Sequence, residues 1–196
     1  MVSSYSWVAL GHLSLYLALF YWGGMMAERA AGRSIWLSSQ SSGPERIAIL
    51  GFRIAFALPL AFPVAIYLVP PLANLDPLTD YTSPLFGFAG QFIAAVGMTI
   101  AFASQMAMGA SWRVGVSEGA TGELVVGGLY SISRNPTFVG HLILLTGVAI
   151  AAPSLATLAA VALYWMSVRF QITREETLFA KSLGEPYQKY LASTPR

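Results

Sequence analysis

The residues best suited to chemistry lie in the stretch LYSISRNPTFVG, residues 129–140, where Arg134, Asn135 and Pro136 stand at the edge of a hydrophobic run. Asparagine followed by proline is typical of a helix start, with Asn135 as the N-cap and Pro136 in the first turn. The free backbone N–H groups of a helix N-terminus attract anions, and a neighbouring guanidinium can bind a carboxylate or phosphate through two parallel hydrogen bonds. The stretch therefore predicts an anion-binding site, while a plain topology signal is the simpler interpretation of a single boundary arginine.

A second candidate is the acidic pair Glu175 and Glu176, which follows the last hydrophobic run. The pair could bind a cationic group of a ligand, or it could be an ordinary solvated helix end. The sequence GEPYQKYL after it predicts a turn and a short amphipathic helix, whose simplest role is an interfacial anchor. The chain has no cysteine, and its two histidines, His12 and His141, lie far apart in apolar runs, so we expect no metal site. The net charge of +2 is too small to indicate a nucleic-acid partner.

The elements that must position these residues are hydrophobic. The chain is 56% hydrophobic and 10% charged, whereas soluble domains carry about 25% charged residues. This composition predicts an all-α integral membrane protein with about five transmembrane helices. The last two are short, 16 and 18 residues, and nearly contiguous, which predicts a tight helical hairpin. The five runs are Tyr5–Ala27, Ile47–Val69, Leu85–Met108, Thr137–Ala152 and Pro153–Phe170. The first run lacks the basic start of a signal peptide, so we expect it to be a retained helix.

The distribution of charge predicts an orientation. With five crossings, all eleven Lys and Arg residues fall on one side of the membrane, whereas residues 70–84 on the other side hold two aspartates and no cation. Cytoplasmic loops are enriched in Lys and Arg, so we place the N-terminus outside and the C-terminus in the cytoplasm. The glycine-rich loop 109–136 and the polar tail share the cytoplasmic face, where we expect any active site. We divide the chain into a three-helix membrane region, 1–108, and a region that carries the chemistry, 109–196.

The order of three motifs, GASWR, ELVVGGLYSISRNPTFVG and REETLFAKSLGEPYQKYL, resembles the isoprenylcysteine carboxyl methyltransferase and phospholipid methyltransferase superfamily. The resemblance covers residues 109–191. It implies S-adenosylmethionine as the methyl donor, bound on the cytoplasmic face, and a lipophilic acceptor, either a lipid or a small molecule, that reaches the site through the membrane. Whether the acceptor presents a carboxylate, amine, thiol or hydroxyl is left open.

Carried over by position, the resemblance also assigns roles to individual residues. Its cofactor-binding residues are Leu124, Val125, Gly128, Tyr130, Arg134, Asn135, Pro136 and Phe138 in the first motif, and Glu175, Glu176 and Tyr187 in the second. The sequence departs from the family where Asn135 replaces a histidine, Phe138 a tyrosine, and Gln171 an arginine. Arg169 or Arg174 would cover for that arginine, and we expect these two residues and Glu176 to be the catalytic candidates.

The chemistry of the donor agrees with these assignments. Its carboxylate suits Arg134 and the helix N-terminus, its amine suits Glu175 or Glu176, and its sulfonium suits the aromatic face of Tyr130 or Phe138. Methyl transfer needs mainly positioning and exclusion of water, and a general base only for a protonated acceptor. Two alternatives remain: an NADPH-dependent membrane reductase, which needs more helices and phosphate-binding cations, and a non-catalytic descendant of the family.

Overall fold

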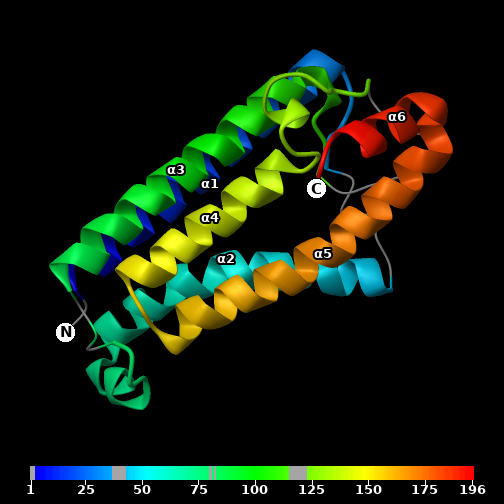
Figure 1. The fold of residues 1–196 in the computed structure, drawn as a ribbon. Coiled ribbons are helices and arrows are strands. Elements are labelled where there is room, and N and C mark those ends of the chain that lie inside the picture. Colours follow the sequence, from blue (N-terminus) through cyan, green and yellow to red (C-terminus); the bar gives the residue numbers. More distant parts are fainter. Residues whose placement is uncertain (1–2, 37–42, 80, 82, 115–122) are drawn as a thin grey trace.

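The protein is described by a computed structural model over residues 3–36, 43–79, 81, 83–114 and 123–196, and it is helical throughout its main elements. Each of the five predicted hydrophobic runs forms a helix (Figure 1). The helices are α1 (Ser4–Ala31), α2 (Pro44–Leu68), η2 (Pro70–Leu75), α3 (Pro84–Met108), η3 (Gly109–Ser111), η4 (Gly128–Ser131), α4 (Pro136–Ala151), α5 (Leu155–Leu183) and α6 (Glu185–Ser193).

The helix ends follow local chemistry. Proline lies in the first turn of α2, α3, α4 and α6, where its missing N–H costs no hydrogen bond. Helix α5 begins with a capping box formed by Ser154 and Thr157. The Leu155 N–H donates to the Asp76 carboxylate at 2.7 Å, so the loop after α2 also caps α5. Helix α1 ends at Gly32, whose φ of 62° suits glycine.

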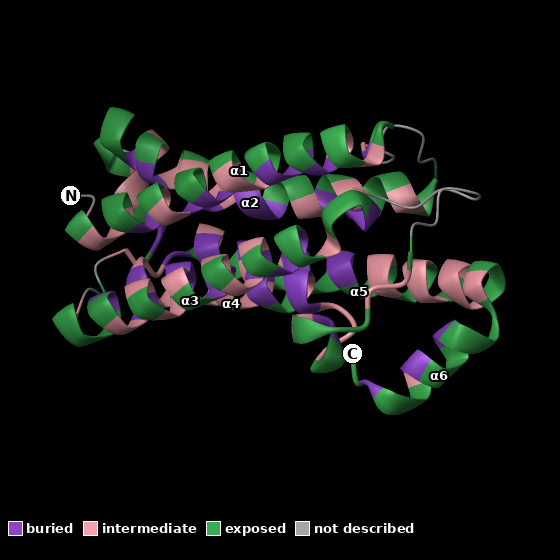
Figure 2. Cartoon of the chain, turned by 90° about the horizontal axis from the view of Figure 1, so that it is seen from above, coloured by how far each residue is buried: buried purple, intermediate pink, exposed green. Residues whose placement is uncertain are grey.

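Within the described residues, four helices are long and apolar enough to cross a membrane: α1, α2, α3 with η3, and α5. Large apolar side chains lie exposed on the outer faces of these helices, where Figure 2 shows most exposed residues. The chain is therefore an integral membrane protein. Helix α4 has only 16 residues, about 24 Å, which is less than the roughly 30 Å of a hydrocarbon core. Of the five predicted crossings, four correspond to helices of spanning length, and the fifth corresponds to a shorter apolar helix whose crossing stays a prediction.

Helices α3 and α4 pack unusually close together because glycines line their contact. Gly90 and Gly97 on α3 meet Gly140 and Gly147 on α4, and a Cβ atom added at any of them would overlap the backbone of the other helix. Glycine permits this approach, and in lipid such close packing is a main source of helix association.

The predicted hairpin is only partly seen. Residues 152–154 do connect α4 directly to α5, but the two helices diverge from this turn (Figure 1). Helix α4 packs mainly on α3, whereas α5 packs mainly on α2. Small residues explain this packing. The glycines of α4 contact those of α3, and Gly51 of α2 lies against Ser167 of α5.

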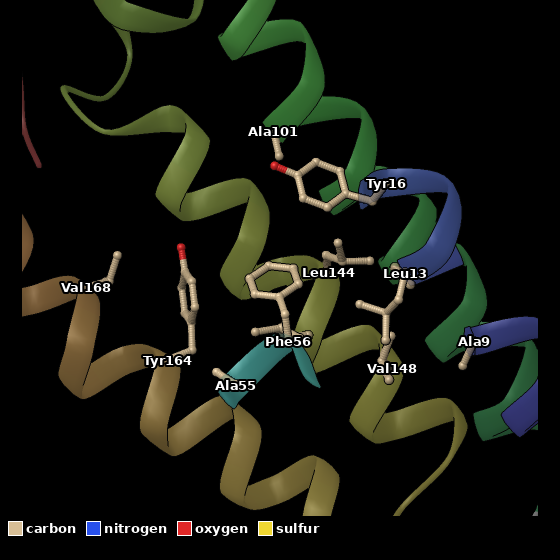
Figure 3. Packing of buried hydrophobic residues seen from close by; sticks show 12 residues of the cluster. Ala9, Leu13, Tyr16, Ala55, Phe56, Ala101, Leu144, Val148, Tyr164 and Val168 are labelled. Atoms are coloured by element: carbon tan, nitrogen blue, oxygen red, sulfur yellow. The ribbon is translucent and has the colours of Figure 1, made fainter. Parts of the chain in front are cut away.

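A buried polar network ties three helices together inside the core. Tyr16 of α1 and Tyr164 of α5 approach α4 from different sides (Figure 3), and their hydroxyls contact Nε2 and Nδ1 of His141. The Tyr164 hydroxyl donates its single proton to the Phe138 carbonyl at 3.1 Å. His141 Nδ1 must therefore donate to Tyr164, at 3.0 Å, and Nε2 accepts from Tyr16. The histidine is neutral and satisfied, which supports its structural role.

The two ends of the bundle should face opposite sides of the membrane. The chain has no cysteine, so Tyr81→Cys, at the end that carries the N-terminus, and Ser193→Cys, near the C-terminus, can be labelled selectively. We expect an impermeant thiol reagent to label Tyr81→Cys on intact cells, and Ser193→Cys only after the membrane is opened. Labelling of both variants from the same side would contradict this topology.

Candidate active site

A cavity of about 680 Å³ lies at the end of the bundle that holds the C-terminus. One half is apolar and is formed by α1, α2 and the first turns of α4. The other half is polar and is formed by residues before α4, the end of α5, and α6. Its apolar wall includes Leu17, Phe52, Phe56 and Leu60, and its polar wall includes Arg113, Asn135, Gln171 and Glu175. One continuous space can thus hold a polar molecule against an apolar one.

Arg134 lines the cavity, yet its guanidinium is already bound within the protein. Nε and Nη2 donate to Glu176 Oε1 at 3.1 and 2.8 Å, and Nη1 donates to the carbonyls of Leu191 and Thr194 at 3.1 and 2.5 Å. The Arg134 N–H also donates to the Pro195 carbonyl at 2.8 Å. Four of the five guanidinium donors are therefore used. Arg134, which we expected to bind a ligand carboxylate, thus links the C-terminal segment to the start of α4.

The acidic pair meets the residues before α4, as expected, but its two members differ. Glu176 lies between two guanidiniums, because its Oε2 accepts from Arg196 at 2.6 Å while Oε1 accepts from Arg134. Its side chain is 13% exposed. Glu175 lines the cavity near Arg113. Glu176 is thus held in ion pairs with Arg134 and Arg196, whereas Glu175 faces the cavity.

The sequence motif GASWR placed Arg113 near the site without assigning it a role. Its guanidinium stacks over the Phe179 ring at 4.6 Å, and Nη1 donates to the Ser111 carbonyl at 3.0 Å. Burial lowers the pKa of Arg113, and the nearby Glu175 carboxylate raises it, so the group remains a cation at neutral pH. Arg113 is therefore better placed than Arg134 to bind an anionic group in the cavity.

Asn135 occupies the predicted N-cap position of α4, but its side chain makes no capping hydrogen bond. The expected capping role is thus wrong for the side chain. Its Nδ2 is instead buried without a partner in the described part of the chain, and the same is true of Trp112 Nε1 and Gln171 Oε1. All three residues line the cavity. A buried unpaired polar group costs about 1–3 kcal/mol, so three around one space indicate a polar ligand.

Aromatic residues close the polar half. The Tyr130 hydroxyl donates to the Ser104 carbonyl at 3.2 Å, and the Tyr190 hydroxyl of α6 donates to the Tyr130 carbonyl at 2.6 Å. Burial raises the pKa of Tyr130 and of Tyr187 to about 12 each, so both are neutral at physiological pH. These rings offer polarisable faces to a cation without adding a charge of their own.

The structure does not bring all predicted residues together. Leu124, Val125, Pro136 and Phe138 line the cavity, as expected. In contrast, Arg169 stacks on Trp165 and Arg174 pairs with Glu45, and neither lines the cavity. Both are exposed on α5, so the structure does not bring either into the cavity beside Gln171, and their expected role in place of the family's arginine stays a prediction. Gly128, with φ of 60°, starts η4 and does not line the cavity either. The glycine-rich residues 115–122 lie outside the described part.

Comparisons with known proteins agree with the fold and identify the family. A solved eukaryotic intramembrane Ras methyltransferase, isoprenylcysteine carboxyl methyltransferase, matches 99% of this chain and 67% of its own with a TM-score of 0.63. The sequence identity is 18%, so the likeness shows a shared fold. No curated protein sequence matches the chain. Residues 86–186, just over half of the chain, match the phospholipid methyltransferase family. The resemblance in the sequence motifs is therefore confirmed, and this chain belongs to the phospholipid methyltransferase family.

Proposed function

We propose that the protein transfers a methyl group from S-adenosylmethionine to a lipophilic acceptor in the membrane. The observation that carries the proposal is the continuous cavity, whose polar half adjoins an apolar half between α1 and α2. Membership of a methyltransferase family supports the reaction type. The predicted orientation would put the polar half on the cytoplasmic side, where the donor is available.

The residues of the polar half fit this donor. S-adenosylmethionine has a carboxylate, an amine, an adenine and a sulfonium. Arg113 and the unpaired Asn135 Nδ2 are donors for its carboxylate or adenine acceptors, and Gln171 Oε1 is a free acceptor. Glu175 offers a carboxylate for the amine. The ring of Tyr187 faces the same space and suits a sulfonium.

When bound, S-adenosylmethionine supplies an activated methyl group for in-line displacement. The protein contributes by positioning the donor and the acceptor and by excluding water from the site. Glu176 and Arg134 hold α6 and residues 194–195 against the start of α4, which closes the polar half toward solvent. In the apolar half, His141 has both ring nitrogens engaged. We therefore assign it no proton transfer from the acceptor.

The experiment that tests this function uses purified protein, donor labelled in the methyl group, and a total lipid extract. Formation of a labelled, lipid-soluble product supports methyl transfer. Binding of NADPH in place of S-adenosylmethionine would support the reductase. Binding of neither compound would support the non-catalytic alternative and contradict the proposal.

Glu175→Gln should weaken binding of S-adenosylmethionine by about 1.5–3 kcal/mol, because a hydrogen bond to the charged amine is lost. Calorimetric titration of the purified protein measures this. Glu185→Gln is a matched control, since Glu185 pairs with Lys189 on the exposed face of α6, and both side chains are 78% exposed. Equal affinity in the two variants would show that Glu175 does not bind the amine.

A further inference from the structure

We infer that Phe179 is a positioning residue for the methyl donor: its ring holds the Arg113 guanidinium where that group binds the carboxylate of S-adenosylmethionine. The inference rests on the proposed methyl transfer. It adds a role for an aromatic side chain to which the sequence motifs assign none. Arg113 follows η3, whereas Phe179 lies far along the chain on α5, so only the fold brings the two together.

Phe179 lies on the face of α5 that lines the cavity. Four residues at four-residue spacing form this face: Gln171, Glu175, Phe179 and Leu183. The Phe179 ring therefore adjoins Glu175, the carboxylate proposed for the donor's amine. The carboxylate of the donor is attached to the same carbon atom as that amine. A group that binds it must thus lie close to Glu175, and Phe179 holds Arg113 there.

The contact between the two side chains can orient Arg113 without using its hydrogen-bond donors. The guanidinium carbon of Arg113 lies over the Phe179 ring, 4.6 Å from its centroid. Within the described residues, one of the five guanidinium N–H donors is used, by Nη1 to the Ser111 carbonyl at 3.0 Å. A cation–π contact attracts the charge to the face of the ring. The N–H groups that a carboxylate needs therefore stay available.

Phe179 is in turn held by α6. The Tyr187 ring meets it edge to face, with ring centroids 5.5 Å apart and an interplanar angle of 80°. Tyr187 is buried and also packs against the Tyr190 ring. An arginine side chain loses much conformational entropy when a ligand fixes it, so one that is fixed beforehand binds that ligand more tightly. The aromatic contacts supply this fixing before the donor arrives.

Three carboxylates line the cavity, and none of them forms an ion pair with Arg113 in the described part of the chain. Glu176 is held by two other arginines. Glu123 is exposed in the segment before η4. Glu175 lies near Arg113, and the positive charge of Arg33 opposes its effect on the guanidinium. Arg113 can therefore bind the donor's carboxylate while Glu175 binds the amine.

The test compares two ligands, S-adenosylmethionine and its decarboxylated form, which keeps the adenine, the sulfonium and the amine. Calorimetric titration of the purified protein in detergent, without any acceptor, measures both affinities in the absence of turnover. We expect the wild type to bind S-adenosylmethionine at least tenfold more tightly than the decarboxylated form, because only the former has the carboxylate that Arg113 binds.

Phe179→Leu should reduce this preference at least fivefold and change the affinity for the decarboxylated form less than twofold, because the guanidinium loses its support. Phe179→Tyr should keep the preference, since its ring also attracts the cation. Phe179→Met retains more side-chain volume without a ring, and it replaces the leucine variant if that variant does not fold. Phe170→Leu is the matched control, because Phe170 is an exposed residue of α5 outside the cavity, and it should bind like the wild type.

A double-mutant cycle shows whether Phe179 acts through Arg113. Arg113→Gln should abolish the preference for S-adenosylmethionine. Adding Phe179→Leu to Arg113→Gln should then cause no further loss of preference, because the effects of two residues that act as a unit are not additive.

Four results would overturn the inference: equal binding of the two ligands by the wild type, an unchanged preference in Phe179→Leu, an equal loss of affinity for both ligands in that variant, or a further loss of preference in the double variant. The third result would mean that the Phe179 ring only fills space. Failure of the proposed function looks different, since the wild type would then bind neither ligand.

Discussion

Gly140→Ala should destabilise the protein by about 3 kcal/mol, since the added methyl group overpacks a rigid contact. A Cβ atom at this position would lie 2.5 Å from the Ala101 nitrogen and 2.8 Å from both the Ala101 Cα and the Gly97 carbonyl oxygen. These are backbone atoms of α3, so no side chain can rotate away and the two helices must separate. Because α4 also begins at the cavity, donor binding should weaken in parallel. Denaturant titration in detergent and calorimetry measure the two effects.

The matched control is Gly11→Ala in α1. A Cβ atom at Gly11 has no atom within 4 Å, so the same substitution there should leave stability unchanged or raise it by up to about 1 kcal/mol through helix propensity. If both alanine variants unfold alike, the close packing of α3 and α4 does not stabilise the protein.

Glu176→Gln should release the C-terminal segment and cost about 3–5 kcal/mol, the usual effect of removing one partner from a buried ion pair. The two side chains of the pair with Arg134 are only 12% and 13% exposed, and Arg196 loses its partner at the same time. Arg134 would keep its two carbonyl acceptors, but its charge would lie uncompensated. We expect faster hydrogen exchange in α6 and a lower melting temperature.

Glu185→Gln supplies the comparison, because it breaks a solvent-exposed ion pair on the same short helix. Exposed pairs contribute roughly 0–1 kcal/mol, so α6 should stay protected in this variant. Equal protection of α6 in Glu176→Gln and Glu185→Gln would mean that the pair with Arg134 is not what closes the site.

The candidate site was predictable where a motif specifies a residue type at a fixed spacing. The family motifs identified Tyr130, Asn135 and Glu175, and all three line the cavity. Arg169 and Arg174 lie close to Gln171 in sequence but do not line the cavity. At 100° per residue, two positions turn Arg169 toward the opposite side of α5. Arg174, three positions from Gln171, lies on a neighbouring part of the helix surface, where its guanidinium pairs with Glu45.

The sequence by itself determined that the chain is a helical membrane protein, where its helices lie, and which family it belongs to. These features depend on composition, hydrophobic runs, prolines in first turns and local motifs, all of which act over a few residues. Only the tertiary structure decided that α4 packs on α3, that Arg134 binds Glu176 rather than remaining free, and that Arg53 and Arg113 line one cavity. The physical reason is that these contacts join residues tens of positions apart. They depend on steric fit between glycine-lined helices and on competition for hydrogen-bond partners, and a local sequence pattern does not specify which partner lies nearest.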